Sequence, residues 1–330
     1  MKRILSLLFA LALLLGAVGA SAETKTTPSI CIVVAGTLGD RSFYDSAYEG
    51  IQRLQTDYGT VINCIECGED SSMYEQALYD AAEGYDVIAA VGWQFYDYLA
   101  DENGVLAAYP DKKFLFIDNA LEVIPDNLVC ITYSQNEGSF LAGYVAASLS
   151  TTGIIGVVGG EDSDTINDFI IGYEAGAKFK NPEIRVLKQY ANTYEDPAKG
   201  KECARSLYDM GADVVFAVAG RTGEGVFAAA QEVDRLAIGV DGDQKYIDPQ
   251  HITCSMVKRV GQSIYDMVSD PDTYWCGGQV FTATMSSGYI DLAYGTDDMP
   301  QQVDDALKAE IAVIRQQIID GDIVVPSAFE

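Results

Sequence analysis

Few residues of this chain have the types and the spacing that covalent catalysis requires. Among the 330 residues there is one histidine, His251, in a polar turn after Pro249, whereas a serine triad or a histidine-held metal site needs more. The GxSxG, P-loop and HExxH motifs do not occur. Aspartate and glutamate total 49, so paired carboxylates arise by chance and do not by themselves indicate acid–base catalysis. The sequence therefore predicts a binding protein rather than an enzyme, with no cofactor and no metal.

Cys64 and Cys67 form a CxxC motif, a spacing that redox sites and zinc sites share. A redox CxxC opens a helix, where the helix dipole lowers the thiol pKa. Here the motif ends a predicted strand, and no second CxxC completes a zinc site. Core packing or a local disulfide is the interpretation we favour. The seven cysteines leave at least one without an intramolecular partner, and four of them are predicted to be small core residues: Cys31, Cys130, Cys203 and Cys254.

A glycine-rich loop, Gly220-Arg221-Thr222-Gly223-Glu224-Gly225, follows a predicted strand and opens a predicted helix. Its spacing is GxxGxG and not the GxGxxG of dinucleotide-binding folds. Such a loop can bring backbone N–H groups close to a ligand, which makes Gly220 and Thr222 candidate binding residues. A tight structural turn explains the same glycines almost as well.

Apolar, β-branched runs alternate with helix-period segments along the chain. Strands are predicted at 30–35, 61–65, 87–91 and 114–117, with helices at 46–58 and 73–82. The order then repeats, with strands at 154–158, 186–189, 214–218 and 237–240 and helices at 166–178 and 199–210. Continuous apolar strands separated by helices indicate parallel sheets covered on both faces, which is a doubly wound α/β fold.

The two halves also resemble each other in their residues. Residues 84–91 are similar to 211–218, and each half has a later strand that ends in aspartate, Asp118 in the first and Asp241 in the second. Ligands of open parallel sheets bind beyond the carboxyl ends of the strands, so two facing sheets would place both carboxylates across a cleft. Capping of the following turn is the alternative, but the matching positions favour ligand contact.

The segment after residue 251 departs from the repeat. Strands are predicted at 252–257 and 280–285, and helices at 261–268 and 300–319. If the chain crosses between the lobes here, the added strands form a hinge and the cleft can close around a ligand. We therefore expect one lobe from residues 23–142 with about 256–284, and a second from 143–255 with about 285–330.

The N-terminus predicts export. Lys2 and Arg3 precede an apolar run at 4–18 and the small residues Ala20-Ser21-Ala22, the three-part pattern of a secretory signal peptide. The run is short for a spanning helix, and a retained membrane anchor is the alternative. We expect removal of residues 1–22, no later membrane span, and a protein that is periplasmic or extracellular and associated with the cell envelope.

The charge of the chain restricts its partners. It has 21 basic and 49 acidic residues, a net charge of −28. Nucleic acids and anionic membranes are bound by clustered lysine and arginine, so neither is expected as a partner.

A series of short motifs occurs in a fixed order between about residues 30 and 265. The first is Gly39-Asp40-Arg41-Ser42-Phe43, continued by residues 46–50. The others lie at 116–118, 136–143, 157–160, 181–182, 196–200, 211–214, 219–227, 239–244 and 255–260. Together they resemble the basic membrane protein (BMP) family, the substrate-binding proteins of ABC transporters typified by bacterial purine nucleoside receptors.

The resemblance implies a type I periplasmic-binding-protein fold, a monomer, and a nucleoside ligand, most simply a purine nucleoside. It also implies an ABC permease and its ATPase as partners. Carried over by position, Phe43 would stack on the base, Asp118 would bond the ligand from the first lobe, and Asp241 would accept from the ribose hydroxyls. Lys258 would donate to the ligand or orient Asp241, and Asp40 joins the candidate ligand contacts.

The chain departs from the family at the end of the first strand. Nucleoside receptors carry an aspartate there that contacts the base, whereas residues 33–37 read Val-Val-Ala-Gly-Thr, with no carboxylate before Asp40. Trp93, after Gly92, and Phe95 are candidates for another aromatic face.

Three alternatives stay open at this point. A sugar or another small polar ligand would suit the same fold, because aromatic faces and aspartates serve sugars equally well. A ligand sensor for a signalling receptor is the second. The third is an oxidoreductase built on two nucleotide-binding-like sheets, against which the glycine spacing and the export signal count.

Overall fold

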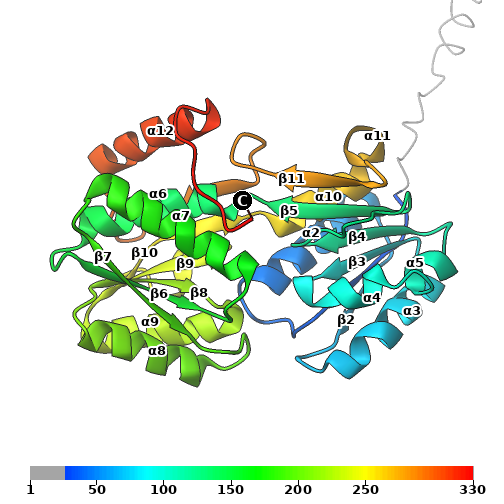
Figure 1. Cartoon of the computed structure of the whole chain (residues 1–330), viewed down its shortest axis with the longest axis horizontal. Helices are drawn as coiled ribbons and strands as arrows, with labels where there is room; N and C mark the ends of the chain where they lie inside the picture. The colour runs from blue at the N-terminus through cyan, green and yellow to red at the C-terminus, as the bar shows by residue number, and fades with distance from the viewer. Residues whose placement is uncertain (1–26, 330) are drawn as a thin grey trace, which may run out of the picture.

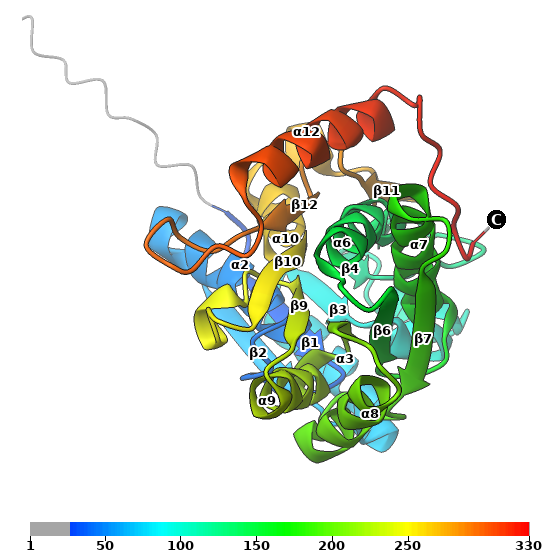
Figure 2. The same ribbon diagram turned by 90° about the vertical axis from the view of Figure 1, so that its left-hand side faces the viewer.

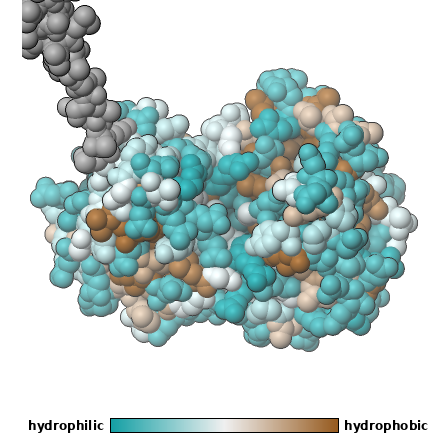
Figure 3. Space-filling model, turned by 180° about the vertical axis from the view of Figure 1, so that it is seen from behind, coloured by the Kyte–Doolittle hydropathy of each residue, from teal (hydrophilic) through white to brown (hydrophobic). Residues whose placement is uncertain are grey.

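Two six-stranded sheets, one in each lobe, form the frame of the molecule (Figure 1). The computed structural model describes residues 27–329. The predicted signal peptide, residues 1–22, therefore lies outside the described residues. Seen from behind, the surface is mostly hydrophilic and is indented between the lobes (Figure 3), in keeping with the strongly acidic composition.

The first sheet has the strand order β11-β5-β4-β3-β1-β2, and all its neighbours run parallel. Its strands are β1 (Ile30–Val34), β2 (Ile62–Glu66), β3 (Val87–Val91), β4 (Lys113–Ile117), β5 (Leu128–Tyr133) and β11 (Gln279–Ala283). One face packs on α2 (Phe43–Tyr58) and α10 (Val260–Ser269). The other packs on α3 (Tyr74–Gly84), α4 (Tyr96–Ala100) and α5 (Val105–Ala108). The four central strands, β1, β3, β4 and β5, are buried, which explains why they read as nearly continuous apolar runs; the edge strands β2 and β11 are partly exposed.

The second sheet has the order β12-β10-β9-β8-β6-β7, with β12 antiparallel to β10. Its strands are β6 (Ile154–Gly159), β7 (Arg185–Tyr190), β8 (Val214–Val218), β9 (Leu236–Asp241), β10 (Ile252–Lys258) and β12 (Ile290–Ala293). α6 (Gln135–Leu149) and α7 (Asp164–Lys180) cover one face, and α8 (Pro197–Asp209) and α9 (Gly223–Val233) cover the other (Figure 2). α12 (Asp305–Ile319) packs on α6. The remaining helices are short: α11 (Pro271–Tyr274), η1 (Ser71–Met73), η2 (Trp93–Phe95), η3 (Gly220–Thr222) and η4 (Lys245–Ile247).

The chain passes between the lobes three times. It crosses from β5 to α6, from β10 to α10, which packs on α2, and from β11 to β12. One hydrophobic core takes buried residues from both lobes, so the crossings lie beside shared packing. We expected residues 135–142 and 256–258 in the first lobe. They belong instead to α6 and β10, which pack with or form part of the second sheet. Elsewhere the assignment of segments to lobes stays a prediction.

The predicted doubly wound α/β fold is confirmed, and every predicted strand is present within two residues of its expected ends. The helix expected at 300–319 starts later, at Asp305, because the side chain of Asp304 caps it by accepting from the backbone N–H of Leu307 at 2.8 Å. Among the longer elements β5, α6 and β12 had no prediction, and neither did the short helices α4, α5, α11 and η1 to η4.

Two glycines let α6 and α7 approach each other at backbone distance. A β-carbon on Gly143 would lie 2.0 Å from the carbonyl oxygen of Tyr173, and one on Gly176 would lie 1.8 Å from that of Phe140. No side chain larger than hydrogen fits at these contacts without moving a helix.

Gly176→Ala should therefore lower the free energy of unfolding by about 1–3 kcal/mol, because the added methyl forces the helices apart. Urea unfolding of the mature chain, residues 23–330, measures this change. Gly84→Ala is the matched control, since a β-carbon at Gly84, in α3, meets nothing within 4 Å. Equal stability of the two variants would contradict the packing described here.

Candidate functional site

A cavity lies between the lobes, at the carboxyl ends of strands from both sheets. It is lined from the first lobe by Asp40, Phe43, Trp93 and Asp118, and from the second by Tyr194, Arg221 and Asp241. Lys258, the last residue of β10, lies at the crossing between them. The cavity holds about 60 Å³, room for a few water molecules, because the lobes contact each other directly around it.

Hydrogen bonds join the lobes around this cavity. The hydroxyl of Ser42 donates to Oδ2 of Asp241, and Nε2 of Gln244 donates to the carbonyl oxygen of Arg41 at 2.9 Å. Near Tyr194, Glu69 of the first lobe accepts from the second: its Oε1 lies 3.1 Å from Oγ1 of Thr193 and 3.0 Å from the backbone N of Tyr194. Polar contacts therefore join the lobes around the cavity, in addition to the apolar core that the two lobes share.

Lys258 is the charged centre of the cavity. Its Nζ lies 2.8 Å from Oδ1 of Asp118, and the side chain is buried. The ammonium also faces three aromatic rings, 4.9 Å from the centroid of Phe43 and 5.1 Å from those of Tyr133 and Phe169. An ion pair and three ring faces together offset the loss of water around this cation.

Asp118 and Asp241 occupy matching places in the two halves, as the internal repeat predicts. Both have left-handed backbone, with φ of +76° at Asp118 and +65° at Asp241, a conformation that aspartate tolerates better than most residues. Each comes at the end of the equivalent strand, β4 in the first sheet and β9 in the second. The unusual backbone turns both carboxylates into the space between the lobes.

Burial and charge act in opposite directions on these two carboxylates. Burial raises the pKa of Asp118, and the ammonium of Lys258 lowers it. Burial likewise raises the pKa of Asp241, which Lys258 and the Ser42 hydroxyl lower. Lys258 forms its ion pair with Asp118 and not with Asp241. The carboxylate of Asp241 accepts one hydrogen bond from Ser42, so its other acceptor positions can bind donors on a ligand.

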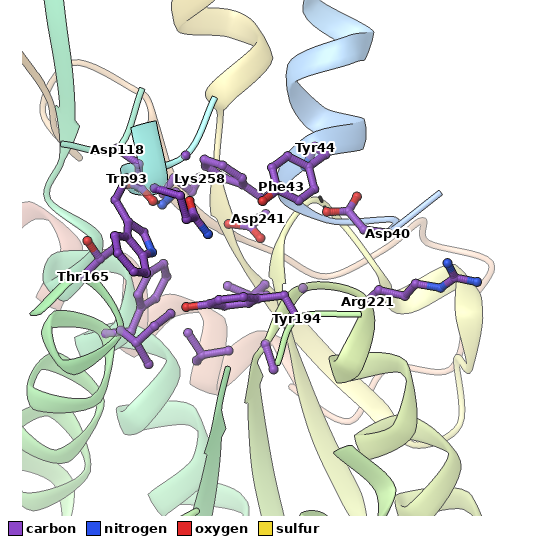
Figure 4. Close-up of a pocket in the computed structure, with 18 of the residues that line it drawn as sticks. Asp40, Phe43, Tyr44, Trp93, Asp118, Thr165, Tyr194, Arg221, Asp241 and Lys258 are labelled. Carbon is purple, nitrogen blue, oxygen red and sulfur yellow. Dashed lines mark hydrogen bonds and ion pairs between the residues drawn. The ribbon is translucent and has the colours of Figure 1, made fainter. Parts of the chain in front are cut away.

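Aromatic rings form the walls of the cavity. Phe43 and Tyr194 lie on opposite sides of it, with Asp241 and Lys258 between them and Trp93 at one end (Figure 4). Flat apolar faces with a few polar groups between them suit a small planar molecule that carries hydroxyl or amino groups.

The structure brings seven of the eight predicted site residues to this cavity: Phe43, Asp118, Asp241, Lys258, Asp40, Trp93 and Gly220. Thr222 does not line it. The Oγ1 of Thr222 accepts from the backbone N of Asp196 at 2.9 Å and joins the starts of α8 and α9. Phe95 was also wrongly placed, because its ring is buried against Tyr74, 4.8 Å between centroids. Ligand contact by the other seven stays a prediction.

Asp40 lines the cavity, but its carboxylate serves the start of α2. It accepts from the backbone N–H groups of Ser42 at 3.0 Å, Tyr44 at 2.9 Å and Asp45 at 3.0 Å. These bonds satisfy N–H groups that a helix start leaves free, and they fix the position of Phe43. Burial raises the pKa of Asp40 to about 7, against the lowering effect of the three backbone bonds.

Several lining residues had no prediction from the sequence. They are Tyr44, Gln94, Thr165, Phe169, Tyr194, Glu195 and Arg221. The rule that ligands bind beyond the carboxyl ends of strands points to the loops after β6 and β7, and so to the neighbourhood of Thr165 and Tyr194. It does not say which side chains in those loops face inward.

Cys64 and Cys67 lie on opposite sides of the first sheet, where Cys64 packs against one core and Cys67 belongs to the other. All seven cysteines are free thiols, so of the two interpretations, packing is confirmed and the local disulfide is wrong. Burial raises the pKa of Cys64 to about 12 and that of Cys67 to about 11. Cys31, Cys130 and Cys254 are buried as predicted, whereas Cys203 is half-buried.

Residues 27–329 contain no cluster of three or more histidine, cysteine, aspartate or glutamate side chains suited to a metal ion. Within the same range, no helix is both long and apolar enough to cross a membrane.

Asp40 makes a pH-dependent contribution to stability whose sign follows from its raised pKa. Between about pH 4 and pH 7 the folded protein retains a proton at Asp40 that the unfolded chain releases. The free energy of unfolding should therefore fall with rising pH, relative to Asp40→Asn, by about 1–4 kcal/mol across this range. Urea unfolding of both proteins at pH 4, 5.5 and 7 measures the difference. A difference that stays constant with pH would show that the three backbone bonds keep Asp40 ionised.

Comparison with known proteins gives consistent matches over nearly the whole chain. The model of a family described as "ABC transporter substrate-binding protein PnrA-like" matches residues 27–328. Basic membrane protein A of Borreliella afzelii is 31% identical over 315 residues, covering 93% of this chain and 94% of that protein. The ABC transporter nucleoside-binding protein BmpA of Lactococcus lactis subsp. cremoris is 34% identical over 336 residues, covering 94% and 92%.

Solved structures of solute-binding proteins share the fold. That of an ABC transporter solute-binding protein from Aeropyrum pernix K1 aligns with a TM-score of 0.80 at 25% identity, covering 90% of this chain and 93% of that one. A second, from Conexibacter woesei, aligns with a TM-score of 0.72 at 24% identity and covers 92% and 99%.

Proposed function

The chain belongs to the PnrA-like family of ABC transporter substrate-binding proteins, and we propose that its ligand is a nucleoside held between the two lobes. Proteins of this family bind a small molecule outside the cytoplasm and work with a membrane permease; they are not enzymes. The family resemblance and the type I periplasmic-binding fold that the sequence predicted are both confirmed.

The observation that carries the proposal is an aromatic slot that contains a buried carboxylate with spare acceptor positions. A ribose ring offers two neighbouring hydroxyl donors, and one carboxylate can accept from both. Asp241 is suited to that contact because, among residues 27–329, its carboxylate accepts a hydrogen bond from Ser42 alone, whereas the carboxylate of Asp118 is paired with Lys258. A nucleobase, flat and apolar on its faces, would lie between Phe43 and Tyr194.

A ligand of this size needs the lobes to separate before it enters, because the cavity holds about 60 Å³. The three crossings allow such a movement, and the polar contacts between the lobes would re-form around the ligand. The closed form would then present a surface built from both lobes to the permease, which the ATPase drives. We further propose that the mature protein is a monomer and lies in the periplasm or outside the cell, at the cell envelope.

Calorimetry on the mature chain tests the ligand and the ribose contact together. The panel contains adenosine, guanosine, inosine, uridine and cytidine, with ribose and glucose as sugars. Asp241→Asn should weaken nucleoside binding by about 10- to 100-fold, because it replaces charged hydrogen bonds with neutral ones. The same variant should melt no lower than the wild type without ligand, because the substitution removes a buried charge.

Asp272→Asn is the control, since Asp272 is exposed and does not line the cavity. Binding of a sugar but no nucleoside, or unchanged nucleoside affinity in Asp241→Asn, would contradict the proposal.

A further inference from the structure

Two glycines at the carboxyl ends of neighbouring strands make room at one edge of the cavity. A β-carbon on Gly92, after β3, would lie 2.5 Å from Oε1 of Gln94, and one on Gly36, after β1, would lie 2.7 Å from Oε1 of Glu195. Gln94 therefore fills the space beside Gly92, and the ring of Tyr44, 2.3 Å from the β-carbon position, fills the space beside Gly36 together with Glu195. β1 and β3 are paired, Val34 opposite Val91, and Gln94 and Glu195 both line the cavity at this edge of the first sheet.

Both groups are hydrogen-bond acceptors with unused capacity. Oε1 of Gln94 is buried and has no hydrogen-bond partner among the described residues. The two oxygens of Glu195 accept from Thr37, at 3.0 Å from its backbone N and 2.9 Å from its hydroxyl. A carboxylate has about four acceptor positions, so Glu195 can accept further bonds. A ligand with N–H donors at this edge would satisfy an acceptor that is otherwise buried and unpaired.

The donors and acceptors of the cavity are thus unevenly placed. Lys258 supplies the buried ammonium close to Asp118 and Asp241, whereas Gln94 and Glu195 present acceptors at the ends of β1 and β3. Nη1 of Arg221 lies 3.8 Å from Oε2 of Glu195, and the arginine side chain is 46% exposed. This long, exposed ion pair leaves the carboxylate able to accept hydrogen bonds from a ligand. A molecule that fits must offer hydroxyl donors to Asp241 and N–H donors to this second edge.

We propose that Gln94 and Glu195 are the base-selecting residues and that they favour a nucleobase with neighbouring N–H donors, as guanine has. The inference rests on the proposed function, with the ribose on Asp241. Guanine presents a ring N–H beside an exocyclic amino group; hypoxanthine lacks the amino group, and adenine places its amino group beside an acceptor nitrogen. Of the common purine nucleosides, guanosine best matches two acceptors.

Gln94 and Glu195 belong to different lobes, so both can contact the base only when the two lobes have closed. Gln94 follows β3 of the first lobe, whereas Glu195 follows β7 of the second and reaches over to Thr37 beyond β1. The first strand carries no carboxylate of its own, since residues 35–37 are Ala, Gly and Thr. A carboxylate arrives at that strand end only when the lobes are together, so a matching base adds its bonds to the closed form alone.

Calorimetry with guanosine, inosine and adenosine tests this assignment, because guanosine and inosine differ by the one amino group. The wild type should bind guanosine about 10- to 100-fold more tightly than inosine. Glu195→Gln and, independently, Gln94→Met should each reduce this ratio to about 3 or less. The loss should fall mainly on guanosine, and thermal melts without ligand confirm that each variant is folded. Glu161→Gln is the matched control: Glu161 lines a second pocket that Gln94 and Glu195 also border, but it does not line the cavity, so the ratio should persist.

Equal weakening of all three nucleosides in Glu195→Gln would overturn the proposal and leave Glu195 as a contact between the lobes. A wild type that binds nucleosides with no preference for guanosine would also overturn it, while the proposed function would stand. If no nucleoside binds at all, the proposed function itself fails.

Discussion

The buried ammonium of Lys258 offsets the negative charge of the carboxylates that are buried between the lobes. Two aspartates, one from each half of the repeat, are buried within reach of it, and each would be costly to ionise there without a compensating charge. The ammonium is paired with Asp118 and enclosed by aromatic rings, so the cation is itself held in place. Charge balance thus favours a polar ligand that donates to Asp241, and the rings give that ligand apolar faces to lie against.

The same arrangement links recognition to movement. Lys258 stands at the end of β10, immediately before the chain crosses into the first lobe at α10, and its partner Asp118 belongs to that lobe. Opening the lobes would break the bond between Ser42 and Asp241 as well as those around Glu69 and Glu195. These are polar bonds that water can replace when the lobes separate. A ligand that supplies donors from within would shift the balance towards the closed form.

The sequence predicts the frame well because the central strands of both sheets are parallel to their neighbours and buried on both faces, so that each is a short apolar run between helices. Asp118 and Asp241 were identifiable because the chain repeats itself. α6 escaped prediction because it is buried on nearly every side and has no polar face to reveal a helical period. Tyr194 and Glu195 escaped because they lie in a loop, where neither periodicity nor composition says which side chain turns inward. Thr222 was misplaced for the same reason: a loop motif indicates proximity to a cleft, not the direction of one hydroxyl.

A crystal structure of the mature protein with its tightest-binding nucleoside tests the central claim most directly. We expect the ribose hydroxyls on the carboxylate of Asp241, the base between Phe43 and Tyr194, and the ion pair between Lys258 and Asp118 intact. A nucleoside bound outside the interlobe cavity, or one inside it with the base on Asp241 and the ribose beside Gln94, would contradict the account.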